Sequence, residues 1–297
     1  MFKCIYFICF NFLLIACSYS DREHATKKEV SKTFDSSKDS LYTRLGKPKV
    51  GEWLYHHKEK GQTFDQYIQS SPILPTKSRN KIYILPLGDF DVDEQKVLDV
   101  AIEYLQVFFD IQIVVMKNVS TEIIPDSSKR EVANSKQLHT RYILHQILEP
   151  QVPKDAIIFE ALTDTDLYPK PSWNFVFGQA ALKKRVAVSS MARFKEYDEQ
   201  DRLLLHKWIK RFIKTVSHET THAFSIPHCR EYRCLMNGSN SLLEADSQPL
   251  ITCLDCTKKI LWATQANADK RYQKLLAFYQ KYGFEEEVKF CKKVLSH

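Results

Sequence analysis

One long amphipathic helix, predicted from about Asp201 to Phe224, constrains this chain more than any other stretch of its sequence. Apolar residues recur along it at intervals of three and four positions, so one side of the helix must be buried. This stripe consists of Leu205, Trp208, Ile209, Phe212, Ile213 and Val216. The last turns contain His218-Glu219-Thr220-Thr221-His222. Because residues four apart share a helical face, both imidazoles can converge on one metal ion with Glu219 beside them.

A third histidine, His228, follows six residues after His222. Neutral imidazoles from His218, His222 and His228 would hold Zn²⁺ and leave one coordination position open to solvent. Glu219 would then be the general base in the hydrolysis of a peptide bond. The plainer alternative is a pair of ordinary helix histidines and a surface histidine that share this spacing by chance. The spacing favours a zinc metallopeptidase, which is a hydrolase.

Four thiols follow the third histidine as two close pairs, Cys229 with Cys234 and Cys253 with Cys256. Two such pairs separated by a loop are typical of a structural zinc site, in which four soft ligands close a tetrahedron. In an oxidising compartment the same residues could instead form two disulfides, most simply Cys229–Cys234 and Cys253–Cys256. Both interpretations stay open at this point.

Taken together, the residues from His218 to Cys256 resemble the archaemetzincin family of zinc peptidases. The signature of that family is an extended metzincin motif with a cysteine directly after the third histidine and three further cysteines around a methionine. Residues 235–250, 166–169 and 172–180 are similar to the archaemetzincin-2 type within the family. The resemblance extends over residues 80 to 262 or so.

The resemblance implies an α/β (α+β), metzincin-like fold: a twisted, mainly parallel sheet with an antiparallel edge strand, a long catalytic helix and a helical C-terminal subdomain. It implies two zinc ions per chain, one catalytic and one structural, and Met236 as the Met-turn residue under the catalytic metal. It also implies aminopeptidase-like cleavage of small peptides. Asp246 or Glu244 could orient a ligand imidazole, and either could equally be a surface cap.

One position departs from the family pattern. Metzincins have glycine three residues before the third histidine, where the helix ends in a turn with positive φ, and this chain has Ser225 there. Serine in the left-handed region costs about 1 kcal/mol relative to glycine. Pro227 fixes an extended approach to His228 and can offset part of that strain.

The half of the chain before this helix alternates between strand and helix patterns. We expect strands at 81–87, 111–116 and 155–162 and helices at 93–109 and 135–148. Residues 175–180 and 185–190 predict an antiparallel edge hairpin, whose open backbone could bind an extended peptide across the metal. A pair of helices, 258–282 and 284–295, should follow around Gly283.

The composition excludes some classes of partner. A formal net charge of +7 is spread over lysine-rich stretches without a basic helix, which favours a solvated surface and no nucleic acid. The chain has seven glycines and neither a Gly-x-Gly-x-x-Gly nor a P-loop pattern, so no nucleotide is expected. A peptide or protein substrate is therefore the partner that the motifs indicate.

The amino terminus predicts export. Residues 1–3 are a short positive start, residues 4–16 are mostly apolar, and Leu14-Ile15-Ala16-Cys17 resembles a bacterial lipobox in which Cys17 is lipidated. The apolar run is too short to span a bilayer. We therefore expect a lipoprotein anchored to a membrane of a bacterial cell envelope, with ordinary secretion as the alternative.

These patterns divide the chain into a signal peptide (1–17), a flexible tether (18–41), an N-terminal extension packed on the domain (42–80) and a catalytic domain (81–297). The catalytic domain divides into residues 81–228, which include the active-site helix 201–224, and residues 229–297, with the four cysteines and further helices. Two other functions stay open: a zinc-containing binding protein without turnover, and a structural surface lipoprotein.

Overall fold

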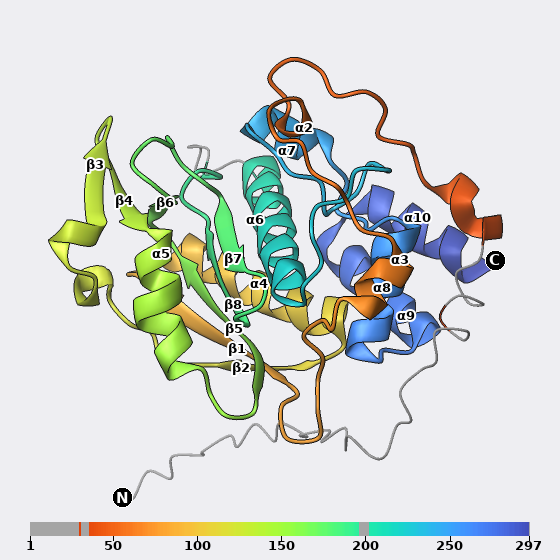
Figure 1. Ribbon diagram of the computed structural model, residues 1–297, viewed down its shortest axis with the longest axis horizontal. Coiled ribbons are helices and arrows are strands. Elements are labelled where there is room, and N and C mark those ends of the chain that lie inside the picture. The colour runs from red at the N-terminus through yellow and green to blue at the C-terminus, as the bar shows by residue number, and fades with distance from the viewer. Residues whose placement is uncertain (1–29, 31–35, 196–201, 297) are drawn as a thin grey trace, which may run out of the picture.

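The computed structural model describes residue 30 and residues 36–195 and 202–296 (Figure 1). Up to β8 its elements are η1 Ser36–Leu41, α2 Trp53–His56, α3 Phe64–Gln69, β1 Lys81–Leu87, α4 Val92–Phe109, β2 Gln112–Val115, η2 Thr121–Ile123, η3 Asp126–Ser128, β3 Lys129–Val132, β4 Ser135–His139, α5 Thr140–Tyr142, η4 Ile143–Leu148, η5 Glu149–Gln151, β5 Ala156–Thr163, β6 Asp166–Tyr168, β7 Gly178–Ala181 and β8 Val186–Ser190. After β8 follow α6 Arg202–Ala223, α7 Leu242–Ser247, α8 Leu254–Thr264, α9 Ala268–Tyr282 and α10 Glu285–Ser296.

The main sheet has the strand order β2-β1-β5-β8-β7. The first four strands are parallel, and β7 runs antiparallel to β8 at one edge. All eight residues of β5 are buried, as expected for a central parallel strand that is covered on both faces. The predicted fold class, a mainly parallel sheet with an antiparallel edge strand, is therefore confirmed.

A second, three-stranded sheet with the order β3-β4-β6 was not predicted. The expected helix 135–148 is wrong over its first five residues, because Ser135–His139 is strand β4. Ala133 and Asn134, with φ of 49° and 64°, form the two-residue turn of a β3-β4 hairpin, and β4 also pairs with β6. Pairing with two strands outweighs the helical pattern, and helical structure starts only at Thr140.

Helix α6 stands between the main sheet and the C-terminal helices (Figure 1). It packs on α4 and on strands β7 and β8. Five residues of its predicted stripe are buried and Leu205 packs against the same core, which confirms the stripe. This burial fixes the helix that carries the first two histidines.

Three helices, not the predicted pair, form the C-terminal cover. The expected helix 258–282 is interrupted because Gln265, with φ of 58°, ends α8, and Asn267 caps the start of α9. Gly283 has φ of 74° and separates α9 from α10, where the chain needs a left-handed residue.

The N-terminal segment packs on the catalytic half of the molecule. Phe64 and Tyr67 of α3 are buried, and the Tyr67 hydroxyl donates to the carbonyl of Phe224 (2.9 Å). The segment already contacts the domain at η1, where Asp39 accepts a hydrogen bond from Tyr232. Residues 36–41 of the predicted tether thus form η1. The predicted signal peptide and Cys17 lie outside the described residues.

Among the helices of the described ranges, none combines the length and the apolar character that crossing a bilayer requires.

A buried carboxyl group, Glu160 on β5, lies directly behind α6. It accepts hydrogen bonds from Ser189 (2.7 Å) and from the hydroxyl of Thr220 on the active-site helix. Burial raises the pKa of Glu160 to about 8. Near neutral pH this group therefore binds its proton more tightly in the folded protein than in the unfolded chain.

We predict that the replacement Glu160→Gln removes a pH dependence of stability. Between pH 4.5 and about 8 the folded protein keeps a proton that the unfolded chain releases, so the free energy of unfolding falls as pH rises. The loss across this window is on the order of 4 kcal/mol. Urea unfolding at pH 5 and pH 8, in the same metal state, should show a flatter pH profile for Glu160→Gln. Identical profiles for parent and variant would contradict this.

Candidate metal centre and cleft

Three imidazoles converge at the carboxyl end of α6. The ring centroids lie 4.5 Å apart for His218 and His222, 4.8 Å for His222 and His228, and 5.2 Å for His218 and His228. Their ligand atoms all lie within 4.8 Å of one another. The structure therefore brings together the three predicted ligands, from one helix and from the loop that follows it.

Each ring is oriented by a hydrogen bond at Nδ1. His218 contacts the carbonyl of Leu235 (2.8 Å), His222 that of Ile226 (2.6 Å), and His228 the carboxylate of Glu59 (2.8 Å). Since Nδ1 donates to these oxygens, Nε2 has the lone pair that a metal requires. This donor set fits a zinc ion bound by three neutral imidazoles.

Burial keeps the first two rings neutral. It lowers the pKa of His218 to about 3 and that of His222 well below its usual value, and the charge of neighbouring histidines acts in the same direction. Neutral imidazole is the form that binds a metal, so little proton release is needed on binding.

Glu219 lies against the edge strand, and glycine at position 178 makes this possible. A Cβ on Gly178 would lie 2.5 Å from Cγ of Glu219 and 2.9 Å from the carbonyl of Val188. Burial, and then the charge of Glu160, raise the pKa of Glu219 well above its usual value. The carboxyl group is therefore placed between the imidazoles and the open edge of the sheet, with a high affinity for a proton.

A cleft of about 990 Å³ passes along this group. Its walls include Trp53, Trp173 and Phe175, the β7 residues Gly178 to Ala180, and the residues 237–240 that follow Met236. The volume suits a segment of a few residues. The edge of β7 therefore lies where an extended peptide could hydrogen-bond beside the histidines.

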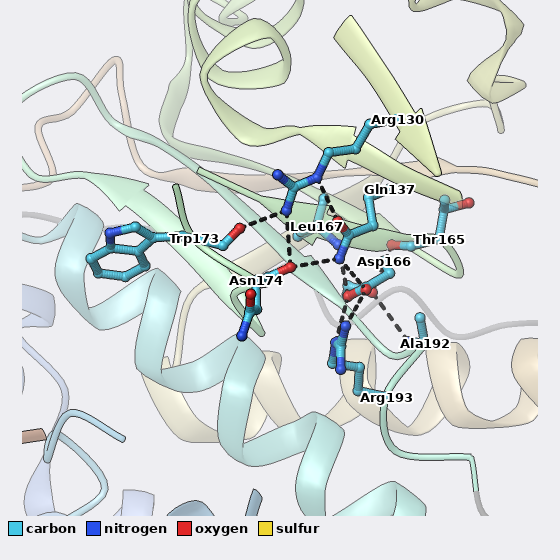
Figure 2. Close-up of polar contacts among 10 residues, drawn as sticks. Arg130, Gln137, Thr165, Asp166, Leu167, Trp173, Asn174, Ala192 and Arg193 are labelled. Carbon is cyan, nitrogen blue, oxygen red and sulfur yellow. Dashed lines mark hydrogen bonds and ion pairs between the residues drawn. The ribbon is translucent and has the colours of Figure 1, made fainter. Parts of the chain in front are cut away.

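A buried polar network holds the loop that leads into β7 (Figure 2). Asp166 is 2% exposed and receives two hydrogen bonds from Arg193 (2.9 and 2.7 Å) and one from Gln137 (2.6 Å). The amide of Gln137 and the guanidinium of Arg130 donate to the backbone carbonyls of the loop, at Pro171, Trp173 and Asn174. This wall of the cleft therefore depends on the second sheet.

Ser225 adopts the left-handed conformation that the family pattern assigns to glycine, with φ of 69°. Its Oγ donates to the carbonyl of Leu182 (2.9 Å) and accepts from the amide of Ile73 (3.2 Å). These two bonds connect the end of α6 to the edge hairpin and to the N-terminal segment. They offset the backbone strain, and His228 still reaches the other two imidazoles.

The four cysteines of the second predicted site form a buried cluster of free thiols. Their Sγ atoms lie within 4.8 Å of one another, with 3.7 Å between Cys229 and Cys253, far longer than a disulfide bond. Hydrogen bonds from the other three thiols lower the pKa of Cys229. Burial, with hydrogen bonding to Cys229, raises the pKa of Cys234. Four cysteine sulfur atoms this close to a common point fit a zinc ion, which would bind them as thiolates.

Met236 is fully buried and packs among these cysteines and Tyr232. Its backbone carbonyl accepts from the amide of Cys229 (2.7 Å). Its predicted role under the catalytic metal stays a prediction.

The carboxylate that orients a ligand is Glu59, which the sequence patterns did not indicate. Asp246 pairs with Arg211 (2.9 and 2.6 Å), and Glu244 accepts from the backbone amides of Trp53 and Asn240. Glu59 is 169 residues away from His228 along the chain, and no spacing rule links them. Gly178 likewise has no local signal, because its contact with Glu219 is made only in the folded chain.

Comparison with known proteins agrees with this geometry. The sequence pattern of peptidase family M54 matches residues 89–261, more than half of the chain. Archaemetzincin-2 of Pongo abelii is 28% identical over 295 residues, covering 89% of this chain and 81% of that protein. Archaemetzincin of Methanopyrus kandleri is 40% identical over 97 residues, covering 33% of this chain and 51% of that protein.

A solved structure has the same fold. The crystal structure of archaemetzincin from Methanopyrus kandleri aligns with a TM-score of 0.52 at 27% identity and covers 65% of this chain and 99% of that one. About a third of this chain therefore lies outside the part shared with that protein.

We predict that two replacements of Ser225 differ in their effect on the free energy of unfolding. Ser225→Gly loses two hydrogen bonds but relieves the left-handed strain, so its free energy of unfolding should stay within about 1 kcal/mol of the parent. Ser225→Ala loses the bonds and keeps the strain, and should lose about 1–2 kcal/mol. Urea unfolding of both variants measures the difference. Full stability of Ser225→Ala would show that the hydrogen bonds do not compensate the strain.

Proposed function

Because the chain belongs to peptidase family M54, the archaemetzincins, we propose that Glu219 is its general base and that His218, His222 and His228 hold its catalytic zinc. The chain is a zinc metallopeptidase, a hydrolase whose substrates are peptides or proteins. One observation supports this assignment most directly: three imidazoles, each held at Nδ1, present their other nitrogens to a common point beside Glu219.

The side chains divide the work of hydrolysis. Zinc, when bound, supplies a Lewis acid that polarises the scissile carbonyl and makes water more acidic. Glu219 accepts a proton from the water molecule as its oxygen forms a bond with the carbonyl carbon. The same carboxyl group then delivers the proton to the leaving nitrogen as the C–N bond breaks.

Substrate binding is proposed at the edge of β7. An extended peptide would add as one more strand, with main-chain hydrogen bonds giving affinity and with its side chains alternating between the cleft and solvent. We propose aminopeptidase-like cleavage of small peptides. The support for it is the similarity to archaemetzincin-2 and a cleft volume of about 990 Å³, which accommodates a short peptide.

A second, structural zinc ion is proposed at Cys229, Cys234, Cys253 and Cys256, which makes two ions per chain. The close packing of the four thiols supports it, and so does a backbone amide, that of Cys253, which donates to Sγ of Cys234 (3.2 Å). Such N–H donors stabilise thiolate charge.

The proposed chemistry predicts that Glu219→Gln retains zinc and loses turnover. Removal of a general base lowers kcat by roughly 10²- to 10⁴-fold. Hydrolysis of a mixed peptide library and zinc content, expected near two ions per chain, are measured on the same preparations. Glu231→Gln, an exposed carboxylate between the cysteines, is the matched control and should keep parental activity. Equal inactivity of the parent and Glu219→Gln after zinc loading would count against catalysis.

We propose that the chain is exported and anchored to an envelope membrane by a lipid on Cys17, with 1–17 as its signal peptide. The support is the positive start, the apolar run and the residues Leu14-Ile15-Ala16-Cys17. A tether of low hydrophobicity would follow, and then the extension 42–80 and the catalytic domain 81–297.

This anchoring predicts that Cys17→Ala abolishes incorporation of labelled palmitate and releases the enzyme from the membrane fraction of the expressing bacterium. A variant at another cysteine of the same region, Cys9→Ala, should keep the label, because residue 9 would be removed with the signal peptide. Unlabelled parent protein in the medium would favour ordinary secretion instead. Label that persists in Cys17→Ala would overturn the assignment of the lipid to this residue.

A further inference from the structure

The N-terminal segment 53–61 forms a wall of the cleft although it lies outside the residues that match the family pattern. Helix α2 of this segment lies beside α7 (Figure 1), where the amide of Trp53 donates to both carboxylate oxygens of Glu244 (2.9 and 3.1 Å). The segment is therefore attached to α7.

Glu59 is the point at which the segment reaches the metal site. Its Oε1 accepts hydrogen bonds from Nδ1 of His228 (2.8 Å) and from the indole Nε1 of Trp53 (2.9 Å). Its backbone carbonyl accepts a third bond from Arg230, two residues after His228. The side chain and the backbone of Glu59 are thus both held by the chain around the third ligand.

The hydrogen-bond donors around Glu59 stabilise its carboxylate form. Burial by itself would raise the pKa of Glu59, but hydrogen bonds from His228 and Trp53 and the charge of His228 outweigh burial and keep the pKa low. Within the described residues, Oε2 of Glu59 is buried without a hydrogen-bond partner. The carboxylate therefore makes its side-chain hydrogen bonds through the single oxygen that faces the imidazole.

Trp53 fixes the carboxylate by close packing. A Cβ on Gly238 would lie 2.4 Å from Cδ1 of Trp53, so glycine is required for the indole to lie there. The Trp53 ring also stacks on His57 (3.9 Å) and meets the rings of His228 (5.3 Å) and Trp173 (6.1 Å) edge to face. It therefore contacts the third ligand and the loop before β7 at the same time.

We propose that the segment 53–61 is part of the catalytic centre, with Glu59 as the positioning residue for His228 and Trp53 as the residue that holds Glu59. The inference rests on the proposed function, because it assigns a metal to the three imidazoles. An anionic acceptor at Nδ1 selects the tautomer with Nε2 free, restricts rotation of the ring and increases its basicity. His218 and His222 have backbone carbonyls for this purpose, and only His228 depends on a distant side chain.

The test is metal affinity at the three-histidine site of the full chain. Cobalt is the probe, because a four-thiolate centre has sulfur-to-metal charge transfer in the near ultraviolet and intense d–d bands at long visible wavelengths. A three-imidazole centre has no such charge transfer, and its d–d bands are weaker and lie at shorter visible wavelengths. Titration of the metal-free protein with Co²⁺, then competition with Zn²⁺, gives both affinities. Peptidase kcat and KM are measured at saturating zinc.

We expect Glu59→Ala to weaken metal binding at the histidine site by roughly 10- to 100-fold and to leave the thiolate bands unchanged. Glu59→Gln keeps the shape and loses the charge, so a smaller loss in the same direction is expected, and this variant carries the test should Glu59→Ala fold poorly. Trp53→Phe keeps an aromatic ring and removes the indole donor, and should weaken binding by a few-fold. In each case kcat should fall more than KM rises.

Glu52→Gln is the matched control, because Glu52 directly precedes the segment and, among the hydrogen bonds described, its side chain accepts one bond, from the backbone amide of Lys49. It should bind cobalt as the parent does. Parental affinity, kcat and KM in all Glu59 and Trp53 variants, with a functional histidine site in the parent, would overturn the positioning role alone. A parent that binds one cobalt ion per chain, with the thiolate bands alone, would overturn both this role and the proposed function.

Discussion

The proposed catalytic centre depends on three hydrogen bonds at the Nδ1 atoms of His218, His222 and His228. Each bond fixes a ring that would otherwise rotate, and together they place three lone pairs at one point before any ion arrives. The acceptors come from three parts of the chain: the loop before Met236, the turn after α6, and the N-terminal segment. Preorganisation of the centre is therefore a property of the whole tertiary structure, because α6 alone supplies only two of the rings.

The sheets and helices position α6, Glu219 and the cleft walls through different contacts. The buried apolar stripe packs α6 against the sheet, and Gly178 lets Glu219 lie against the edge strand. Behind the helix, the buried carboxyl group of Glu160 accepts a hydrogen bond from Thr220, the residue that follows Glu219. The second sheet positions the opposite wall through Asp166, Gln137 and Arg130. The proposed chemistry at the edge of β7 thus depends on residues of the strands β3 to β7 as well as of α6.

Local patterns were sufficient where periodicity and ligand spacing decide the structure. Strand 81–87, the α6 stripe and the convergence of His218, His222 and His228 could be predicted because each depends on residues a few positions apart. Strand β4 could not be predicted in this way, because its pairing with β3 and β6 forms only in the tertiary structure and overrides a local helical pattern. The contact between Glu59 and His228 joins residues far apart, and a single glutamate among many leaves no signal.

The third imidazole and the first thiol are consecutive residues, His228 and Cys229, so the two candidate metal sites share one peptide unit. The thiol cluster joins Cys229, the residue next to His228, to Cys234, Cys253 and Cys256, and so it holds the backbone at His228 in place. The three histidines do not connect these four cysteines to one another. With zinc at both proposed sites, demetallation should therefore be hierarchical. A chelator that enters the cleft can remove the ion from the histidine centre and leave the loop folded, but extraction of the ion from the buried thiols frees the backbone on which the neighbouring centre is built.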